Sequence, residues 1–544
     1  DVYGVYNPYE TGDGYFSGFI TNEGSISAGF AANYANVHGI YSFFENDIID
    51  STIANSGNIL AEWSLQDIKQ DNGGGARGYV SGLSAYHVEQ SAIINSGNIT
   101  SLARLKNIGG DADVFAGGIL IGWQGGVRTL QDSSISNTGS IETMVNIDGI
   151  QGDARAGAQG IFVDHVENSS IENTGNINSN VILNNIDGFL ADAWARGIFI
   201  GGLNTLKESS ILNSGSIEAA TNIYGTQGDA SASASGISSD TVVNSTIDNS
   251  GSISASANLN NIGGNDNELQ ILIVRSRGTE AVGISASQVE NSIITNSGSI
   301  EAATNIDGTQ GDASASASGI SSFRAENSSI ENTGSINSTV KLQDIGGLAT
   351  AMASGIHIGP SFYMPRLDTL LDSNIVNTGS INTNADLANI KGDAKASAMG
   401  IYVDNAVSEL KTTTIDNQGA IDVSITTDNS ANQTDFVAAG MMVENSGPDK
   451  IKVENQGKIK LDASELGEFE ETTKIEIDFS SAKIASAVLL SSTNADFSNT
   501  GRIHTSANAR ALSLYDNSDV TLQNGFGYAF TGNPDDNRRP IYVD

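Results

Sequence analysis

A short phrase that recurs along most of the chain is the feature that most limits its fold. The pattern Ile-x-Asn-x-Gly-x-Ile, with some substitutions, occurs thirteen times in 544 residues, at spacings of 33 to 47 residues. Its glycines are Gly24, Gly57, Gly97, Gly139, Gly175, Gly215, Gly251, Gly298, Gly334, Gly379, Gly419, Gly457 and Gly501. Periods of about 20 to 50 residues are typical of solenoids and propellers, so one extended repeat structure is expected.

Within each repeat unit, the local pattern favours strands. The segment "DASASASGI", from Asp312 to Ile320, alternates Ala and Ser with the period of two that marks a half-buried strand. The Asn-Thr-Gly and Asn-Ser-Gly triplets supply turns, because Asn and Gly tolerate positive φ. Each unit contains three such strand segments, enough for one coil of a three-sided helix. The sequence therefore predicts an all-β fold, a single parallel β-helix (β-solenoid) of about 13 units near 40 residues each, with terminal caps.

In a β-solenoid, equivalent residues of successive coils stack about 4.8 Å apart and form columns. Two buried isoleucine columns are predicted, one beginning at Ile53 and the other at Ile59. A third column should be a ladder of stacked side-chain amides, as in cross-β assemblies. Its members are Asn55, Asn95, Asn137, Asn173, Asn213, Asn249, Asn296, Asn332 and Asn377.

The ends of the chain differ from its middle. Residues 1–50 are predicted to form an N-terminal aromatic cap and the first coil, residues 51–505 the solenoid repeats, and residues 506–544 a C-terminal cap or assembly segment. Aromatic residues gather at both ends, together with two arginines near the C-terminus. We expect these residues either to cap the solenoid or to join copies head-to-tail. They are Tyr3, Tyr6, Tyr9, Phe526, Tyr528, Arg538, Arg539 and Tyr542.

Composition excludes several classes of partner and chemistry. The chain has no cysteine, so no disulfide and no thiol site can form. Its 63 acidic and 26 basic residues give a net charge of −37, which disfavours nucleic acid and favours divalent cations or cationic surfaces. No apolar run approaches the roughly 18 residues that a membrane helix needs. Because the chain begins at Asp1 rather than Met, we expect a processed, exported product.

The repeated phrase, together with the Ala-rich alternation, resembles bacterial autotransporter passengers and filamentous-haemagglutinin-like surface adhesins over roughly residues 20 to 505. The resemblance implies a right-handed β-helix that a bacterium exports to its surface or to the medium for attachment or surface-structural work. It carries no catalytic signature. The chain departs from autotransporters in one respect, because no stretch of its C-terminal part has the pattern expected of their membrane barrel. We therefore expect a cleaved passenger, or a secreted protein anchored or polymerised in another way.

These observations predict a non-enzymatic structural or interaction protein. It would serve as an adhesin rod that binds a host or cell-surface glycan or protein, or as the subunit of an extracellular fibre that self-associates head-to-tail. The alternative is a carbohydrate-active enzyme, a polysaccharide lyase or hydrolase, on the same scaffold. Catalysis needs clustered acids and bases. We expect no such cluster from the histidines, which are assigned to different columns. They are His38, His87, His165, His357 and His504.

A column of aspartates is the candidate metal site. Each lies at the start of an Ala-rich strand, and stacked carboxylates would repel by roughly 1 kcal/mol per neighbouring pair even in water. Calcium, which takes several carboxylate and carbonyl oxygens, would relieve this repulsion. The alternative is that these side chains cap backbone amides of turns. The column comprises Asp111, Asp153, Asp192, Asp229, Asp312 and Asp393.

Longer insertions recur at one corner of the unit, after the Gly-Ile strand. Loops on a rigid scaffold often carry binding residues. The insertions place Trp123, Phe362, Tyr363 and Met364 as a sugar- or protein-binding patch. The alternative is that these side chains cover the flank of the solenoid as a small satellite core.

Overall fold

The computed structural model is built from β-strands, and the part of the chain that it describes contains no helix and hence no membrane-spanning helix. The described residues are 2–7, 15–42, 47–68, 75–122, 129–263, 279–359, 369–409, 411–428, 430–432, 434–446, 449–463, 483–491, 494–506, 509–515, 519–523 and 541–543. They form two compact units, Asp1–Ser285 and Ala286–Asp544, a division that the sequence does not predict. Strand β27 (Thr279–Glu290) contains the division.

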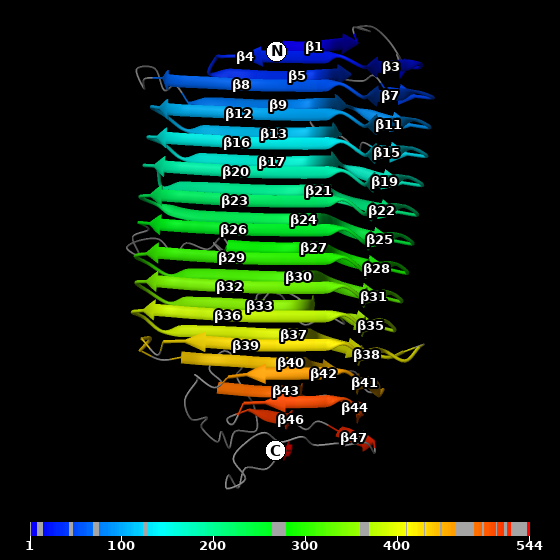
Figure 1. The fold of residues 1–544 in the computed structure, drawn as a ribbon, viewed down its shortest axis with the longest axis vertical. Helices are drawn as coiled ribbons and strands as arrows, with labels where there is room; N and C mark the ends of the chain where they lie inside the picture. The colour runs from blue at the N-terminus through cyan, green and yellow to red at the C-terminus, as the bar shows by residue number, and fades with distance from the viewer. Residues whose placement is uncertain are drawn as a thin grey trace. The chain divides into compact units, whose positions relative to one another are not determined.

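Unit 1 has three parallel sheets, and each repeat adds strands to all three (Figure 1). The long strands of sheet A are β1 (Val2–Asn7), β5 (Tyr34–Ser42), β9 (Ala76–Ala85), β13 (Ala112–Ile121), β17 (Ala154–Val163), β21 (Leu190–Lys207) and β24 (Asp229–Val243), and its short strands are β2 (Tyr15–Phe16), β6 (Asp47–Ile49), β10 (His87–Glu89), β14 (Thr129–Gln131) and β18 (His165–Glu167).

Sheets B and C of unit 1 follow the turns. Sheet B comprises β3 (Phe19–Asn22), β7 (Thr52–Asn55), β11 (Ala92–Asn95), β15 (Ser134–Asn137), β19 (Ser170–Asn173), β22 (Ser210–Asn213) and β25 (Thr246–Asn249). Sheet C comprises β4 (Ser25–Phe30), β8 (Asn58–Ile68), β12 (Asn98–Ile108), β16 (Ser140–Ile150), β20 (Asn176–Ile186), β23 (Ser216–Thr226) and β26 (Ser252–Ile262).

Unit 2 repeats the same three sheets. Its sheet A holds β30 (Ala313–Glu326), β33 (Ala349–Ile358), β34 (Leu370–Leu371), β37 (Ala394–Val407), β40 (Thr434–Ser446), β43 (Lys483–Ser491), β46 (Arg510–Tyr515) and β48 (Ile541–Val543). Sheet B holds β28 (Ile293–Asn296), β31 (Ser329–Asn332), β35 (Asn374–Asn377), β38 (Thr414–Asn417), β41 (Ile451–Asn455), β44 (Asn494–Asn499) and β47 (Asp519–Gln523). Sheet C holds β29 (Ser299–Thr309), β32 (Ser335–Ile345), β36 (Ser380–Ile390), β39 (Ala420–Thr427), β42 (Lys458–Asp462) and β45 (Arg502–Thr505).

The register confirms one coil per repeat unit. Ile135 pairs with Ile171, Asn137 with Asn173, and Ile141 with Ile177, always across one repeat. Both isoleucine columns are buried in each unit, which confirms the predicted aliphatic ladders. The all-β parallel β-solenoid is therefore confirmed, whereas the right-handed sense of its coil and the boundaries at residues 50 and 505 stay predictions.

The asparagine column forms the predicted amide ladder within each unit. In unit 1, the Nδ2 group of Asn137 donates to Oδ1 of Asn173 at 2.7 Å, and Asn173 donates to Asn213 at 2.8 Å. In unit 2, Asn296 donates in the same way to Asn332 at 2.7 Å. Every amide thus points in the same direction along its stack, and each links one coil to the next.

The turn after each asparagine requires glycine because successive coils touch there. A Cβ atom added at Gly175 would lie 2.0 Å from the carbonyl oxygen of Gly139, in the preceding coil. Gly24 lies in the first coil, and a Cβ there would meet nothing within 4 Å. The glycine is therefore needed for the close approach of one coil to another, not for the shape of the single turn.

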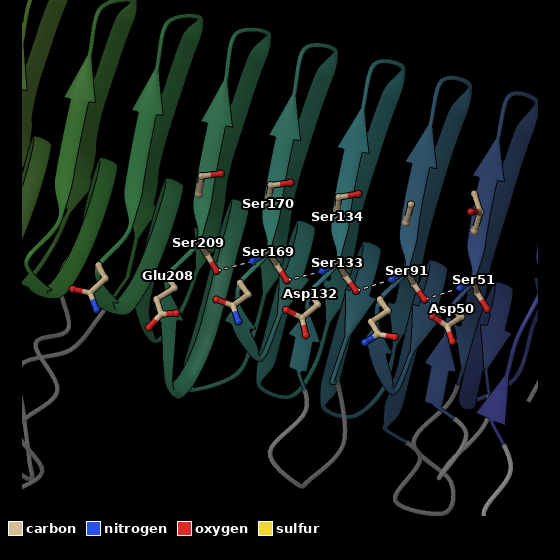
Figure 2. Close-up of a pocket in the computed structure, with 16 residues that line it drawn as sticks. Asp50, Ser51, Ser91, Asp132, Ser133, Ser134, Ser169, Ser170, Glu208 and Ser209 are labelled. Carbon is tan, nitrogen blue, oxygen red and sulfur yellow. Dashed lines mark hydrogen bonds between the residues drawn. The ribbon is translucent and has the colours of Figure 1, made fainter.

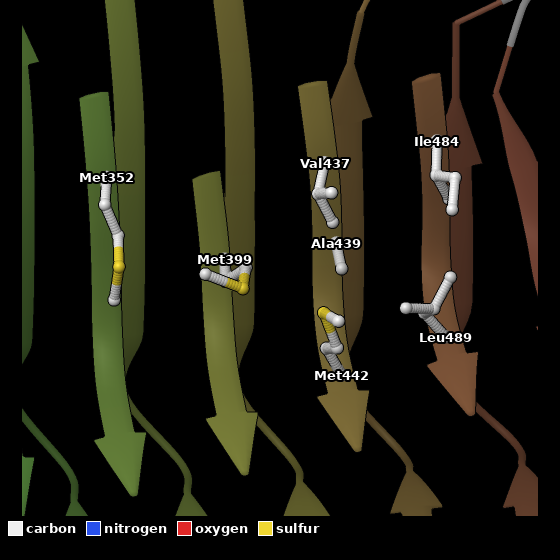
Figure 3. Close-up of a cluster of buried hydrophobic side chains, with 7 residues drawn as sticks. All are labelled: Met352, Met399, Val437, Ala439, Met442, Ile484 and Leu489. Carbon is white, nitrogen blue, oxygen red and sulfur yellow. The ribbon is translucent and has the colours of Figure 1, made fainter. Parts of the chain in front are cut away.

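Sheet A of unit 2 carries a second apolar cluster that the sequence does not predict. Met352, Met399, Val437, Ala439, Met442, Ile484 and Leu489 are buried together across β33, β37, β40 and β43 (Figure 3). In β33, Met352 alternates with the buried residues Ala351 and Ala353, so it projects from the opposite face. The strand is therefore buried on both faces here, whereas simple alternation predicts one solvent-exposed face.

Candidate functional site

The predicted aspartate column is correct in part. The strand register places Asp111, Asp153 and Asp229 in one column of unit 1, with Leu190 between the last two, and places Asp312 and Asp393 in the equivalent column of unit 2, with Leu348 between them. The assignment of Asp192 is wrong. Asp192 lies six residues before the isoleucine of its Gly-Ile pair, whereas Asp153 lies eight residues before the equivalent isoleucine, so Asp192 is paired with Arg155 instead.

The carboxylates of this column bond to the backbone. Oδ1 of Asp111 accepts a hydrogen bond from the amide of Asp153 at 3.0 Å, and Oδ1 of Asp153 accepts one from the amide of Leu190 at 3.0 Å. Asp312 caps the amide of Leu348 at 2.7 Å. Each of these three carboxylates caps an amide of the following coil, which is the alternative to calcium that the sequence offers. Among the described residues, no group of three or more His, Asp or Glu side chains could hold a metal ion. Calcium binding stays a prediction.

The structure places few of the other predicted residues. Tyr3 and Tyr6 lie in β1, which pairs with β5, and Tyr542 lies in β48, which pairs with β46. The remaining residues of the predicted assembly ends and ligand patch lie outside the described residues. They are Tyr9, Trp123, Phe362, Tyr363, Met364, Phe526, Tyr528, Arg538 and Arg539.

A polar groove in unit 1, which the sequence does not predict, is a candidate site. It has a volume of about 1030 Å³ and follows the corner between the short strands of sheet A and the strands of sheet B (Figure 2). We call it the corner groove. Three columns line it, each with one residue per coil. The first contains Asp50, Gln90, Asp132, Asn168, Glu208 and Asn244, the second Ser51, Ser91, Ser133, Ser169 and Ser209, and the third Thr52, Ala92, Ser134, Ser170 and Ser210.

The serine column holds the floor of the corner groove in place. The backbone amide of Ser133 donates to Oγ of Ser169 at 3.0 Å, and the amide of Ser169 donates to Oγ of Ser209 at 3.0 Å. Each hydroxyl in turn donates to the carbonyl two residues earlier, as Ser169 does to Glu167 at 2.7 Å. Figure 2 shows this row running from coil to coil. The serine two residues before the repeated phrase therefore forms a structural ladder, as the asparagine within the phrase does.

The first column of the corner groove carries a charge at every second coil. Asp50, Asp132 and Glu208 alternate with the neutral residues Gln90, Asn168 and Asn244. All six adopt the left-handed conformation, with φ of 48 to 50°. Alternation sets the carboxylates about 10 Å apart rather than about 4.8 Å, which reduces their repulsion. The groove therefore presents regularly spaced negative charges among amides and hydroxyls.

A second alternation borders the corner groove. His87 and Glu89 in β10 recur as His165 and Glu167 in β18, two coils later. His87 Nδ1 lies 2.6 Å from Oγ1 of Thr129, and His165 Nδ1 lies 2.9 Å from Oγ1 of Thr205. Thr129 pairs with His165 and belongs to the intervening coil, so the two histidines share one column. The expectation that the histidines lie in different columns is wrong for this pair.

Of the two histidine–glutamate pairs, the one formed by His165 and Glu167 has a lysine, Lys207, bonded to its glutamate. Lys207 Nζ donates to Oε1 of Glu167 at 2.6 Å, and this bond lowers the pKa of Glu167 and raises the pKa of Lys207. Burial lowers the pKa of His165, although nearby Glu167 acts in the opposite direction. At neutral pH, the histidine is therefore a neutral hydrogen-bonding group, and the carboxylates carry the charge beside the groove.

The fold and the corner groove together define a class of protein, a three-sheet parallel β-solenoid with a periodic polar groove along one corner. No family model, no curated protein and no solved structure matches this chain.

Proposed function

We propose that the chain is a non-enzymatic, exported β-solenoid that acts at a bacterial cell surface as an adhesin and holds an extended ligand along the corner groove. The observation that carries this proposal is that each repeat contains two kinds of residue, one that joins the coils and one that lines the groove. Residues that recur in every coil, such as Asn173 and Ser169, form hydrogen bonds between coils. Beside the serine ladder, the groove is lined by residues that differ from coil to coil, such as Asp132 and Asn168, and these can serve recognition.

The chemistry of the corner groove favours a polar, extended ligand. None of its described lining residues is aromatic or basic, and its hydroxyls, amides and carboxylates recur at the spacing of the coils. A polymer with its own regular repeat can make the same contact several times, and linked contacts raise the overall affinity without any new interaction. A host or cell-surface glycan, or an extended protein segment, has such a repeat.

The test compares binding of matched variants to intact host cells. We expect the double variant D132N/E208Q to bind more weakly than the natural chain, because both carboxylates lie in the corner groove. The control is E142Q, which neutralises an exposed carboxylate on sheet C. Equal loss of binding in both variants would indicate a general effect of net charge. Full binding by the double variant would remove the groove from the proposal.

Head-to-tail assembly into a fibre is a second candidate, supported by the first coil of unit 1. Phe19 is 82% exposed and Tyr34 is 73% exposed, so two large side chains of this coil are accessible to a partner. Among the described strands, β3 pairs only with β7, and β4 only with β8, so this end presents unpaired strand edges. Electron microscopy at high protein concentration tests the idea, with F19S/Y34S as the variant. Monodisperse particles of the natural chain would remove it.

The enzymatic alternative has a direct assay. The natural chain is incubated with acidic and neutral polysaccharides, and the products are examined for new reducing ends or unsaturated sugars. A non-enzymatic adhesin should release neither. Turnover of any of these substrates would replace the adhesin proposal with the alternative of a carbohydrate-active enzyme.

A further inference from the structure

Sheet A of unit 1 carries an unusual row of polar side chains on its outer face. Gln159 in β17, Arg196 in β21 and Ser235 in β24 occupy equivalent positions in three successive coils. In β21, Arg196 alternates with Ala193 and Ala195, which are buried in the solenoid interior. The side chains of this row therefore project outwards, away from the aliphatic core.

None of the three polar groups in this row is satisfied by hydrogen bonds. Gln159 is 2% exposed and Ser235 is 8% exposed, yet Oε1 of Gln159 and Oγ of Ser235 have no hydrogen-bond partner. Among the described residues, no hydrogen bond or ion pair holds the guanidinium of Arg196. Its contact is the ring of Phe199, whose centroid lies 3.8 Å from Cζ. Buried polar groups without a partner are rare in folded proteins, and two of them, on either side of a half-buried guanidinium, indicate that another molecule supplies the missing bonds.

Aromatic rings flank the polar row. The rings of Phe162 and Phe199 lie with their centroids 5.6 Å apart, and Phe162 is buried with Phe115 and Leu120. Phe199 and Trp194 remain partly exposed. Trp194 precedes Arg196 by two residues in the same strand, so both project from the same face. The row thus offers hydrogen-bonding groups between partly exposed aromatic rings.

The charges around the row favour a neutral ligand over an anionic one. Arg155 is already paired with Asp192 at 3.7 Å, on the same face. Asp240 and Glu280 lie near enough to Arg196 to raise its pKa, while burial lowers that pKa to about 10, so Arg196 stays cationic at neutral pH. Two guanidinium groups therefore face three carboxyl groups. A carboxylate ligand would meet no net positive field, whereas a hydroxyl-rich ligand needs none.

We propose that this row is a saccharide-binding site that takes a neutral sugar ring of a glycan. The apolar face of the sugar lies against Phe199 and Trp194, the N–H groups of Arg196 donate to its oxygens, and its hydroxyls donate to Gln159 and Ser235. Polar anchors among aromatic rings fit the general composition of small-ligand sites. The inference rests on the proposed adhesin function and deepens it, because it names the ligand class and a second contact surface beside the corner groove.

The experiment measures binding of cello-, manno- and galacto-oligosaccharides to the full chain by ligand-observed NMR and calorimetry. We expect one series to bind, and R196Q to weaken its binding by about tenfold or more, because a charged hydrogen-bond donor is lost. The control is R104Q, which removes an exposed arginine on sheet C that is paired with Glu62. The second variant, F199A, removes the stacking ring and should also weaken binding. Thermal melts confirm that each variant is folded.

Several outcomes would overturn the saccharide site. Absence of binding by every oligosaccharide at millimolar concentration would mean that ordered water satisfies the row. Equal affinity of R196Q and the natural chain would place the sugar elsewhere, and Arg196-dependent binding of an acidic peptide would replace the sugar with a protein partner. Cell binding separates this proposal from the adhesin function. If the chain binds cells and R196Q does so equally well, the saccharide site fails and the adhesin function stands. If the chain binds sugars but does not bind cells, the saccharide site stands and the adhesin function fails.

Discussion

Replacement of Asn173 by alanine tests whether the amide ladder stabilises the stack of coils. Asn173 is fully buried, accepts a hydrogen bond from Asn137 at 2.7 Å and donates one to Asn213 at 2.8 Å. It also makes longer contacts of 3.3 Å to the carbonyls of Gly175 and Ser216. Its removal leaves the Nδ2 donor of Asn137 and the Oδ1 acceptor of Asn213 without their shortest hydrogen bonds. A buried polar group left unpaired costs about 1–3 kcal/mol, so we expect a loss of about 4 kcal/mol.

The matched control is N176A, three residues further along the same coil. Asn176 is exposed, and its side-chain oxygen accepts a hydrogen bond from Ser216 Oγ at the surface at 2.8 Å. Surface substitutions of this kind usually change stability by less than about 0.5 kcal/mol. Comparison of N173A with N176A therefore distinguishes the effect of breaking the ladder from the effect of removing any asparagine side chain.

The assay combines urea unfolding with local hydrogen exchange. Repeat arrays unfold by nearest-neighbour interactions, so the effect should be largest in the coils next to the substitution. We expect faster exchange of the amides in β15, β19 and β22 of N173A, and little change in N176A. A difference of less than about 1 kcal/mol between the variants, with equal exchange in these strands, would refute the reasoning.

Three further predictions concern other columns of the fold. G175A should disrupt stacking, because its Cβ would lie 2.0 Å from a carbonyl oxygen of the preceding coil, whereas G24A should leave the melting temperature unchanged. S169A should cost about 1–2 kcal/mol in urea unfolding, because the amide of Ser133 loses its acceptor. Burial lowers the pKa of His357 from 6.5 to about 4, so the unfolded chain binds the proton more readily. Stability should therefore fall by about 3 kcal/mol as pH drops from 6.5 to 4, and H357F should lose that part of the pH dependence.

The sequence predicts the interior of this protein better than its surfaces. The asparagine and isoleucine columns are predicted correctly because each repeats the same residue type at a fixed distance from the turn glycine. The error at Asp192 arises where a strand starts at a different distance from that turn. Alignment on the Gly-Ile pair, Gly160-Ile161 with Gly197-Ile198, gives the correct register and was the available signal.

The sequence does not predict the corner groove or the polar row of Gln159, Arg196 and Ser235, and the reason is physical. Their columns mix different residue types, and their chemistry depends on which residues the register aligns. The segments "HVEQS" from His87 and "HVENS" from His165 do carry a signal, because both end at a serine of the ladder. The pairing of Gln159 with Arg196, in contrast, follows only from the three-dimensional register of β17 and β21.

The alternation of charge in the corner groove limits how this repeat array can change in length. Removal of the single coil that carries Asn168 would bring Asp132 and Glu208 into neighbouring coils, about 4.8 Å apart. Removal of two coils would preserve the spacing of every remaining carboxylate. The interior accepts any whole number of coils, since each joins its neighbours through the same asparagine, serine and glycine contacts. In this part of the gene, duplications and deletions that persist should therefore come in pairs of repeats.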